Sequence, residues 1–125
     1  MALPGHRGGE MRLLTVDARL RCEHGGRVVL RPPEQGWVRI AGRPVLVERD
    51  PEGCGIRGCP HANPPAGIRP CLKTERVMEG YSDLVRVGGR RVCLEAVTGL
   101  TDGTPPGSVA YTVSEPGQPF VREAP

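Results

Sequence analysis

The feature that most restricts the fold of this chain is a ten-residue unit that occurs twice. VRIAGRPVLV at residues 38–47 and VRVGGRRVCL at residues 85–94 match position by position, 47 residues apart. Each unit has an apolar run, a pair of small residues and a second apolar run. Ala-Gly or Gly-Gly between β-branched runs supplies the positive φ angles that a two-residue hairpin turn requires. The sequence therefore predicts two similar β-hairpins.

A weaker third copy, VSEPGQPFV, occupies residues 113–121 and keeps a Gly-x-Pro with flanking apolar residues. With this copy included, we expect a domain with approximate internal threefold repeats. The simpler alternative is that the three units are hairpins of a small β-sandwich without symmetry.

Much of the remaining chain alternates apolar and polar residues with the period of a strand. In LTVDARL, for example, Leu14, Val16, Ala18 and Leu20 share one face. A short turn near residues 72–78 is the segment expected to be helical. We therefore predict an all-β fold, with strands at residues 12–20, 27–31, 37–40, 45–48, 84–87, 91–96 and 109–113.

Length and composition favour one domain with a lean core. At 125 residues the chain has room for a single domain. We expect a flexible leader at residues 1–10, the folded domain at residues 11–117 and a tail at residues 118–125. With one Trp, two Tyr and one Phe, the core must be built mainly from Val, Leu and Ile. Such a core would gain from an additional cross-link.

The charge pattern and the N-terminal residues restrict the partners and the compartment. The net charge of +3 comes from 17 basic and 14 acidic residues without a long run of either, which does not indicate a nucleic-acid partner. Residues 1–10 lack the apolar stretch of a signal peptide, and no segment approaches the roughly 18 apolar residues of a membrane span. We therefore expect folding in the cytoplasm, where cysteines are more often metal ligands or core residues than disulfides.

Residues 48–75, between the two matching units, carry five prolines, four glycines and almost no strand pattern. A loop of this length needs a fastener other than secondary structure. Thiolate and imidazole ligands suit zinc, which closes a structural site with four of them. The alternative is an incidental disulfide in this loop between its first two cysteines, with its histidine in solvent. Six side chains could supply a zinc site: Cys22, His24, Cys54, Cys59, His61 and Cys71.

The motif RCEHGG places Cys22 and His24 two residues apart. On an extended strand their side chains would share one face, and Gly25 and Gly26 would let the backbone turn sharply beneath a shared ion. The fifth cysteine, Cys93, takes the place that a leucine has in the first ten-residue unit. We therefore predict that it packs as a small apolar side chain.

Several motifs occur in an order that resembles one known family. CEHGG, VRIAGRPVLV, GCP, PC, VRVGGRRV and DGTPPGSVAYTV follow one another as in PAAR-like spike-tip proteins of contractile injection systems. These systems are phage-tail-like particles related to type VI secretion tips. The resemblance covers residues 16–113 and implies a small cone-shaped β-rich domain that caps a trimeric β-helical spike, with a metal site near the sharp end.

The same resemblance implies a ligand set. It points to Cys22, His24, Cys59 and Cys71 as the ligands of a structural zinc, with Cys54 and His61 as alternates. The chain departs from type VI tips, which use more histidine, and it has no literal Pro-Ala-Ala-Arg, only PPAG at residues 64–67.

The function that this resemblance implies is mechanical. The protein would cap and sharpen the spike, one copy per trimer, and aid envelope puncture, with effector cargo as a further partner that the resemblance admits. It would assemble in the cytoplasm and become exposed or extracellular with the particle, without enzymatic activity, nucleic-acid binding or stable membrane association.

Two other classes of protein share some of these features. A small zinc adaptor for nucleic acid or protein would share the cysteines but would normally show two close cysteine pairs. An enzyme with Cys22 as nucleophile and His24 as base would need an orienting acid and an oxyanion site, and the sequence offers neither.

Overall fold

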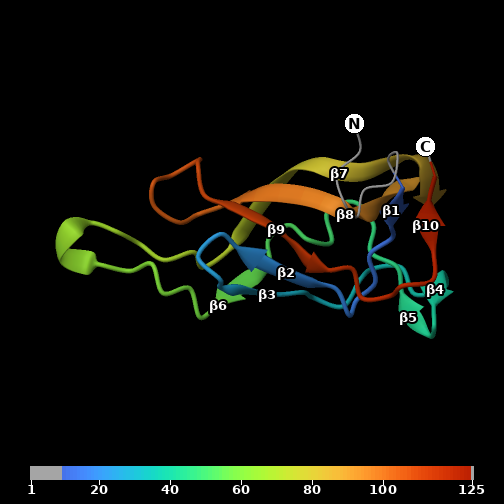
Figure 1. Cartoon of the computed structure of the whole chain (residues 1–125), viewed down its shortest axis with the longest axis horizontal. Coiled ribbons are helices and arrows are strands. Elements are labelled where there is room, and N and C mark those ends of the chain that lie inside the picture. Colours follow the sequence, from blue (N-terminus) through green and yellow to red (C-terminus); the bar gives the residue numbers. More distant parts are fainter. Residues whose placement is uncertain (1–9, 125) are drawn as a thin grey trace.

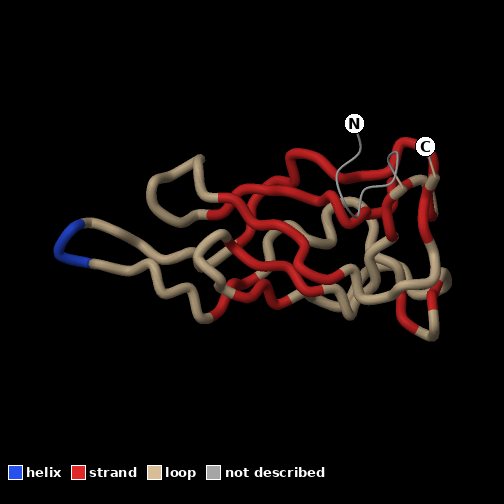
Figure 2. The backbone as a smooth tube through the Cα atoms, in the orientation of Figure 1, coloured by secondary structure: helices blue, strands red, loops and turns tan. Residues whose placement is uncertain are grey.

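The structure is a computed structural model that describes residues 10–124 (Figures 1 and 2). Within this range the chain is all-β apart from a short 3₁₀ turn, η2 (Pro64–Ala66), so the predicted fold class is confirmed. The strands, in chain order, are β1 (Met11–Arg12), β2 (Arg19–Cys22), β3 (Arg27–Val29), β4 (Arg39–Ile40), β5 (Arg43–Pro44), β6 (Gly55–Arg57), β7 (Thr74–Val87), β8 (Arg90–Thr101), β9 (Ala110–Glu115) and β10 (Arg122–Glu123).

One antiparallel sheet runs through the described residues in the order β6-β3-β2-β9-β8-β7. Its strands follow the expected period of two. In β2, Leu20 and Cys22 are buried while Arg19 and Arg21 are exposed, because successive side chains point to opposite faces. The fully buried ring of Tyr111, from β9 of the same sheet, belongs to the same core cluster as Leu20 and Cys22. This sheet carries the main core.

The β7–β8 hairpin bends tightly over this core. A Cβ atom at Gly80, where φ is +109°, would lie 2.3 Å from the backbone of Val97 in the facing strand. A Cβ atom at Gly99 would lie 2.5 Å from the ring of Tyr111, whose hydroxyl donates to the Glu75 carbonyl at 3.1 Å. Only glycine fits these two close approaches.

The two matching sequence units form the same hairpin, as predicted. The turn between β4 and β5 has positive φ at Ala41 (+52°) and Gly42 (+80°), and the turn between β7 and β8 has positive φ at Gly88 (+59°) and Gly89 (+82°). These angles are those of the type I′ turn that two-residue hairpins favour. Figure 1 shows both turns at the same end of the molecule, near β1 and β10.

The same side-chain contact supports each of these turns. Arg39 donates through Nη1 to the Gly42 carbonyl at 3.3 Å, and Arg86 donates through Nη1 to the Gly89 carbonyl at 3.1 Å. The two arginines occupy the same position of the ten-residue unit. The similarity of the two sequence units therefore extends to side-chain geometry.

The third copy expected at residues 113–121 does not form a hairpin, so that prediction is wrong. Its first three residues belong to β9, and residues 116–121 form an irregular loop. Pro116 and Pro119 lack the N–H donors that a returning strand would need. A third two-stranded ribbon does exist, but it pairs β1 with β10, with Met11 opposite Glu123 and Arg12 opposite Arg122.

The segment expected as a C-terminal tail is, up to Glu123, part of the folded unit. Gln118 is only 5% exposed, and its side-chain amide donates to the carbonyls of Leu13 and Val121 at 2.8 Å each. Of the expected N-terminal leader, residues 1–9 lie outside the described residues, and Glu10 forms an ion pair with Arg122.

A closed ring of backbone hydrogen bonds joins the chain segments around Leu14, Leu46 and Cys93. The N–H of Leu14 donates to Cys93 at 2.9 Å, that of Cys93 to Leu46 at 3.0 Å, and that of Leu46 to Leu14 at 3.0 Å. All three residues are fully buried. Further β-bridges continue the ring on both sides: Thr15 with Val45, Val47 with Val92, and Leu13 with Leu94. Beside it lies a second apolar cluster of Leu13, Ile40, Val45, Val47, Val87, Val92 and Leu94.

Several local predictions are wrong. The strand expected at residues 45–48 is absent from this described stretch, where β5 ends at Pro44 and Val45 and Val47 form only isolated bridges. The strand expected over residues 12–20 is broken by a turn at Val16 and Asp17, where the Ala18 N–H donates back to the Thr15 carbonyl at 2.9 Å. The helical turn expected at 72–78 is absent from this described segment, which runs into β7 because pairing with β8 outweighs local preference. The loop 48–75 contains β6, which pairs with β3.

Candidate metal centre

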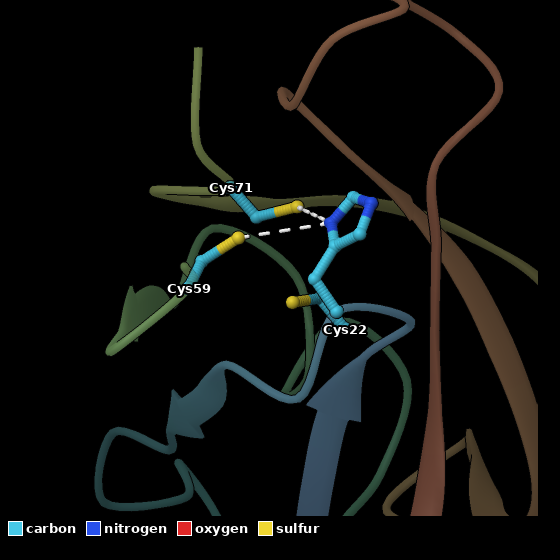
Figure 3. Close-up of side chains that lie close together, drawn as sticks. Cys22, Cys59 and Cys71 are labelled. Atoms are coloured by element: carbon cyan, nitrogen blue, oxygen red, sulfur yellow. Dashed lines mark hydrogen bonds between the residues drawn. The ribbon is translucent and has the colours of Figure 1, made fainter. Parts of the chain in front are cut away.

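Four of the six candidate ligands converge at one point in the structure. Cys22 ends β2, His24 lies in the turn that follows, Cys59 follows β6 and Cys71 precedes β7. Their ligand atoms all lie within 4.8 Å of one another. Figure 3 shows the sulfurs of Cys22, Cys59 and Cys71 pointing toward a common centre. These four residues are the set that the family resemblance implied.

The separations fit a four-coordinate ion. Nδ1 of His24 lies 3.7 Å from Sγ of Cys59 and 3.7 Å from Sγ of Cys71. A tetrahedral zinc with Zn–S near 2.3 Å and Zn–N near 2.0 Å places its ligand atoms roughly 3.5–3.8 Å apart. The two His24–sulfur separations match this geometry, and the four ligand atoms, all within 4.8 Å of one another, could hold a metal ion.

The Cys22–Gly26 turn positions the first two ligands. The Gly25 N–H donates to the Cys22 carbonyl at 2.9 Å, and the Gly26 N–H donates to Sγ of Cys22 at 3.1 Å. His24 therefore lies in a turn rather than on the extended strand that the sequence suggested. Gly25 has φ of +91°, and a Cβ atom at Gly26 would lie 2.9 Å from Sγ of Cys22. Gly25 is therefore required by its backbone conformation, and Gly26 by the lack of space for a side chain.

The other two ligands stand at the base of an excursion, residues 60–70, that forms one end of the molecule (Figures 1 and 2). The arms leading into it are antiparallel, since the Ile56 N–H donates to the Leu72 carbonyl at 2.8 Å. Asp102 braces the second arm by accepting the N–H groups of Leu72 and Lys73 at 2.8 and 3.0 Å. Within the excursion, hydrogen bonds between Asn63 and Ile68 are the main regular pairing. A metal would therefore fasten a segment that has little ladder of its own.

Two residues outside the ligand set, Thr101 and Gly103, lie against the sulfur of Cys71. Thr101 places its hydroxyl oxygen 3.2 Å from Sγ of Cys71, and such outer partners orient a metal ligand and tune its charge. A Cβ atom at Gly103 would lie 2.6 Å from the same sulfur. Sequence reasoning missed both residues. They lie in or beside the DGTPPG motif, whose glycine was the available signal.

The thiol pKa values show what the site requires in the absence of a cation. Burial raises the pKa of Cys71 to about 12. Burial also acts upward on Cys59, but N–H donors from the backbones of Cys71 and His61 outweigh it and leave the Cys59 pKa lowered. Without a cation, the Cys71 sulfur is therefore a neutral thiol at neutral pH. A bound cation would displace the protons and balance the charge.

The two alternates and the fifth cysteine lie outside the cluster. His61 stacks on His24 with ring centroids 4.1 Å apart and the planes 12° apart, so it covers a ligand without being one of the four. Cys54 is fully buried and its thiol donates to the Asp50 carbonyl at 3.3 Å. Cys93 is fully buried in the main core, which confirms its predicted packing role.

The described cysteines are all free thiols, so the Cys54–Cys59 disulfide alternative is not seen. Comparisons with family models, with curated proteins and with solved structures give no match to this chain. Within residues 10–124, no helix has the length and apolar character needed to cross a membrane.

Proposed function

We propose that this protein is the structural tip of a contractile injection system, seated one copy per trimer on the end of a trimeric central spike. The observation that carries the proposal is the closed ring of hydrogen bonds through Leu14, Leu46 and Cys93. A single chain that offers three similar faces can contact the three chains of a threefold partner in equivalent ways. The ring provides the centre of such an arrangement.

Three ribbons surround this ring in the same register. Arg39 pairs with Pro44, Arg86 with Arg91, and Arg122 with Arg12. On this alignment the third unit is split between the two ends of the described chain, with FVRE at residues 120–123 in the place of WVRI and LVRV. This end, defined by the three ribbons, is called the ribbon end below.

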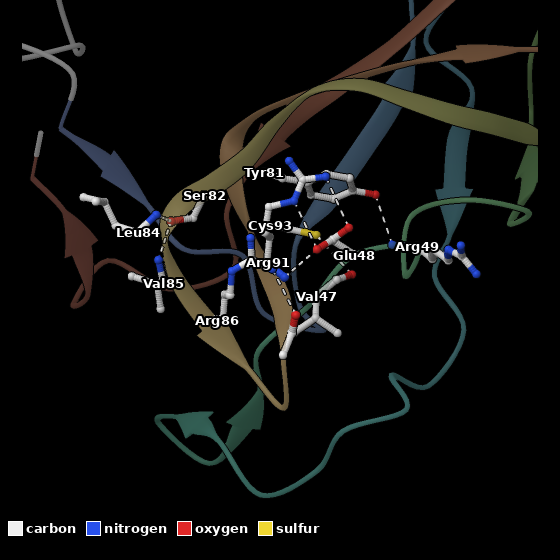
Figure 4. Close-up of polar contacts among 11 residues, drawn as sticks. Val47, Glu48, Arg49, Tyr81, Ser82, Leu84, Val85, Arg86, Arg91 and Cys93 are labelled. Carbon is white, nitrogen blue, oxygen red and sulfur yellow. Dashed lines mark hydrogen bonds and ion pairs between the residues drawn. The ribbon is translucent and has the colours of Figure 1, made fainter.

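Hydrogen bonds link each unit to the next in cyclic order, twice through a glutamate side chain and once through the backbone alone. Glu48, which follows the first unit, accepts the Arg91 N–H of the second at 2.7 Å (Figure 4). Glu95, which follows the second unit, accepts the Arg12 N–H of the third at 2.9 Å. The N–H of Val16, in the corresponding place after the third unit, donates to the Pro44 carbonyl at 3.0 Å. The cyclic order supports approximate threefold repeats.

The shape supports a tip. In Figure 1 the ribbons occupy one end, and the chain tapers toward the excursion of residues 60–70 at the other. A cone that is driven through an envelope must resist deformation where its loops are irregular. The four-ligand cluster lies at the base of that excursion. We propose that it holds a structural zinc, because three thiolates and one imidazole in a closed tetrahedral set are typical of that ion.

A mechanical role agrees with the environment of the ligands. Cys22 is 3% exposed and its sulfur already accepts the Gly26 N–H, so it is a poor candidate for a nucleophile. The proposed tip acts without catalysis. It would assemble with the particle in the cytoplasm and be exposed after release or firing, and effector cargo would be a second partner.

Native mass spectrometry of the chain, purified together with a trimeric β-helical spike protein encoded beside it, tests the proposal. We expect one copy on three spike chains, with added mass equal to one zinc. A metal-bearing monomer that binds no trimer would overturn the tip assignment and leave the metal centre. Salt-dependent binding of that monomer to RNA or DNA would then favour a zinc adaptor.

A further inference from the structure

Three large apolar side chains are exposed at equivalent positions of the three ribbons. Trp37 is 72% exposed, Leu84 68% and Phe120 71%, the highest values for large apolar residues in the described part of the chain. Each stands directly before a Val-Arg pair. We refer to these three residues as the apolar triad. Exposed large apolar groups of this kind mark interaction sites when they are clustered rather than scattered.

A buried polar residue fixes the backbone of each triad member. These residues are Gln35, Ser82 and Gln118, each two positions before its triad member and at most 5% exposed. Ser82 and Gln118 each accept the N–H groups of the triad residue and of the valine after it, at 2.7–3.0 Å. Gln35 accepts the corresponding valine N–H at 3.0 Å. Figure 4 shows this contact at Ser82 and Leu84.

This anchoring bears on binding. A loose apolar side chain on a mobile loop pays an ordering cost when it is buried in a partner, and a held backbone reduces that cost. Trp37 is also packed toward the neighbouring ribbon, since a Cβ atom at Gly88 would lie 3.6 Å from its ring. The triad is therefore presented by a preformed surface.

We propose that the apolar triad is the docking surface of this protein, and that its occupant is the blunt end of a homotrimer with three equivalent apolar recesses. The inference rests on the proposed function, in which the homotrimer is the spike. Three similar side chains at equivalent positions can make three equivalent contacts only with a partner that repeats its binding surface three times. Three identical recesses around an axis would receive one triad member each.

The triad would supply a large part of a stable interface. Aromatic side chains bury roughly 150–250 Å² each when fully covered, and the triad members are 68–72% exposed, so the triad would contribute about 300–500 Å². The partly exposed Val38 and Val121 beside it would add to this area. Stable interfaces bury roughly 800 Å² per partner, so the surrounding surface of the ribbon end would supply the remainder.

The test compares two sets of serine substitutions in the full, metal-loaded chain. The first carries Trp37→Ser, Leu84→Ser and Phe120→Ser. The matched control carries Val29→Ser and Met78→Ser, which also remove exposed apolar side chains but lie outside the triad. Affinity for the trimeric spike protein is measured for both, together with metal content and melting temperature. We expect at least about 100-fold weaker binding for the triad variant and unchanged binding for the control.

The outcomes separate this inference from the function on which it rests. If the triad variant binds the spike as tightly as the wild type, the docking surface is wrong and the tip assignment stands. If the wild type binds no trimer, the tip assignment falls, and self-association that the triad substitutions abolish would identify a second copy as the occupant. Single substitutions add a test of symmetry: each should weaken binding roughly 10-fold or more, and an effect confined to one residue would overturn the threefold arrangement.

Discussion

The two ends of this molecule are stabilised in different ways. At the ribbon end, the ring through Leu14, Leu46 and Cys93 and the apolar cluster beside it satisfy the backbone and exclude water. At the opposite end, called the metal end below, the proline-rich excursion of residues 60–70 has at its base the four side chains that could hold a metal ion, with ligand atoms within 4.8 Å of one another. Ladders and packing can build a surface with repeating geometry, whereas an irregular point needs a local cross-link. The substitutions below would affect one end and spare the other.

Loss of a ligand should have the largest effect. We expect Cys71→Ser to abolish metal binding and to lower the free energy of unfolding by roughly 3 kcal/mol or more, because a structural metal contributes directly to folding. Metal analysis and denaturant unfolding measure both quantities. Cys54→Ser is the matched control, since this buried cysteine lies outside the cluster and should keep one metal per chain. Retention of the metal by Cys71→Ser would contradict the ligand set.

Crowding of the ligand sulfurs should have the next largest effect. A Cβ atom at Gly26 would lie 2.9 Å from Sγ of Cys22, and one at Gly103 would lie 2.6 Å from Sγ of Cys71. We therefore expect Gly26→Ala and Gly103→Ala to weaken metal binding roughly 10- to 100-fold in a chelator competition. Gly55→Ala, which has open space around its Cβ position, should leave the affinity unchanged. Equal affinities for all three variants would show that the sulfur positions are not constrained as described.

At the ribbon end, the buried amide of Gln118 should matter for stability and not for metal. Gln118→Ala leaves the carbonyls of Leu13 and Val121 and the N–H groups of Phe120 and Val121 without these partners. Unsatisfied buried groups typically cost about 1–3 kcal/mol. Denaturant unfolding should show this loss while the metal content stays at that of the wild type. A drop in metal content would mean that the two ends are coupled.

The smallest effect should come from the Glu48–Arg91 pair, which lies beside Tyr81 (Figure 4). Hydrogen bonds from the Arg91 side chain and backbone hold the Glu48 pKa below its ordinary value. Because the folded pKa is lowered, this stabilisation is present above the unfolded pKa of about 4.3 and is lost as pH falls through the folded value. Glu48→Gln should therefore be slightly less stable than the wild type at pH 7 and equal to it at strongly acidic pH. Unfolding curves at both pH values measure this, and a difference that grows toward acid pH would contradict the assignment.

The same contrast explains which parts of the structure could be predicted from the sequence. The β4–β5 and β7–β8 hairpins follow from local turn chemistry, because Ala41, Gly42, Gly88 and Gly89 provide the required positive φ angles. For the metal centre, the residues alone left six candidate ligands, and the set of four came from the order of motifs that resembles PAAR-like proteins. Local turn chemistry was therefore enough to predict the two hairpins but not the ligand set.

The third ribbon could not be found in this way. Its strands, β1 and β10, lie at opposite ends of the described chain. No hairpin turn connects them, so the sequence contains no turn motif that would predict their pairing. The Gly-x-Pro motif at residues 117–119 suggested a hairpin turn that does not form. FVRE at residues 120–123, which matches WVRI and LVRV in the other two units, marks the true third ribbon. The turn at Val16 and Asp17, which interrupts the expected strand, also depends on residues far away in the sequence. Apolar and polar residues keep alternating through this turn, so the pattern does not reveal it. Hydrogen bonds of Thr15 to Pro116 and Gly117 fix the backbone there.

Hydrogen exchange of the same chain with its metal bound and after chelation tests the division between the two ends. Removal of a bound metal should expose the amides of residues 58–71 to exchange, while Leu14, Leu46 and Cys93 keep their protection and binding to the proposed trimeric spike is retained. Loss of protection at both ends, together with loss of spike binding, would show that the metal stabilises the whole fold. It would contradict the claim that the ribbon end is stable without the metal.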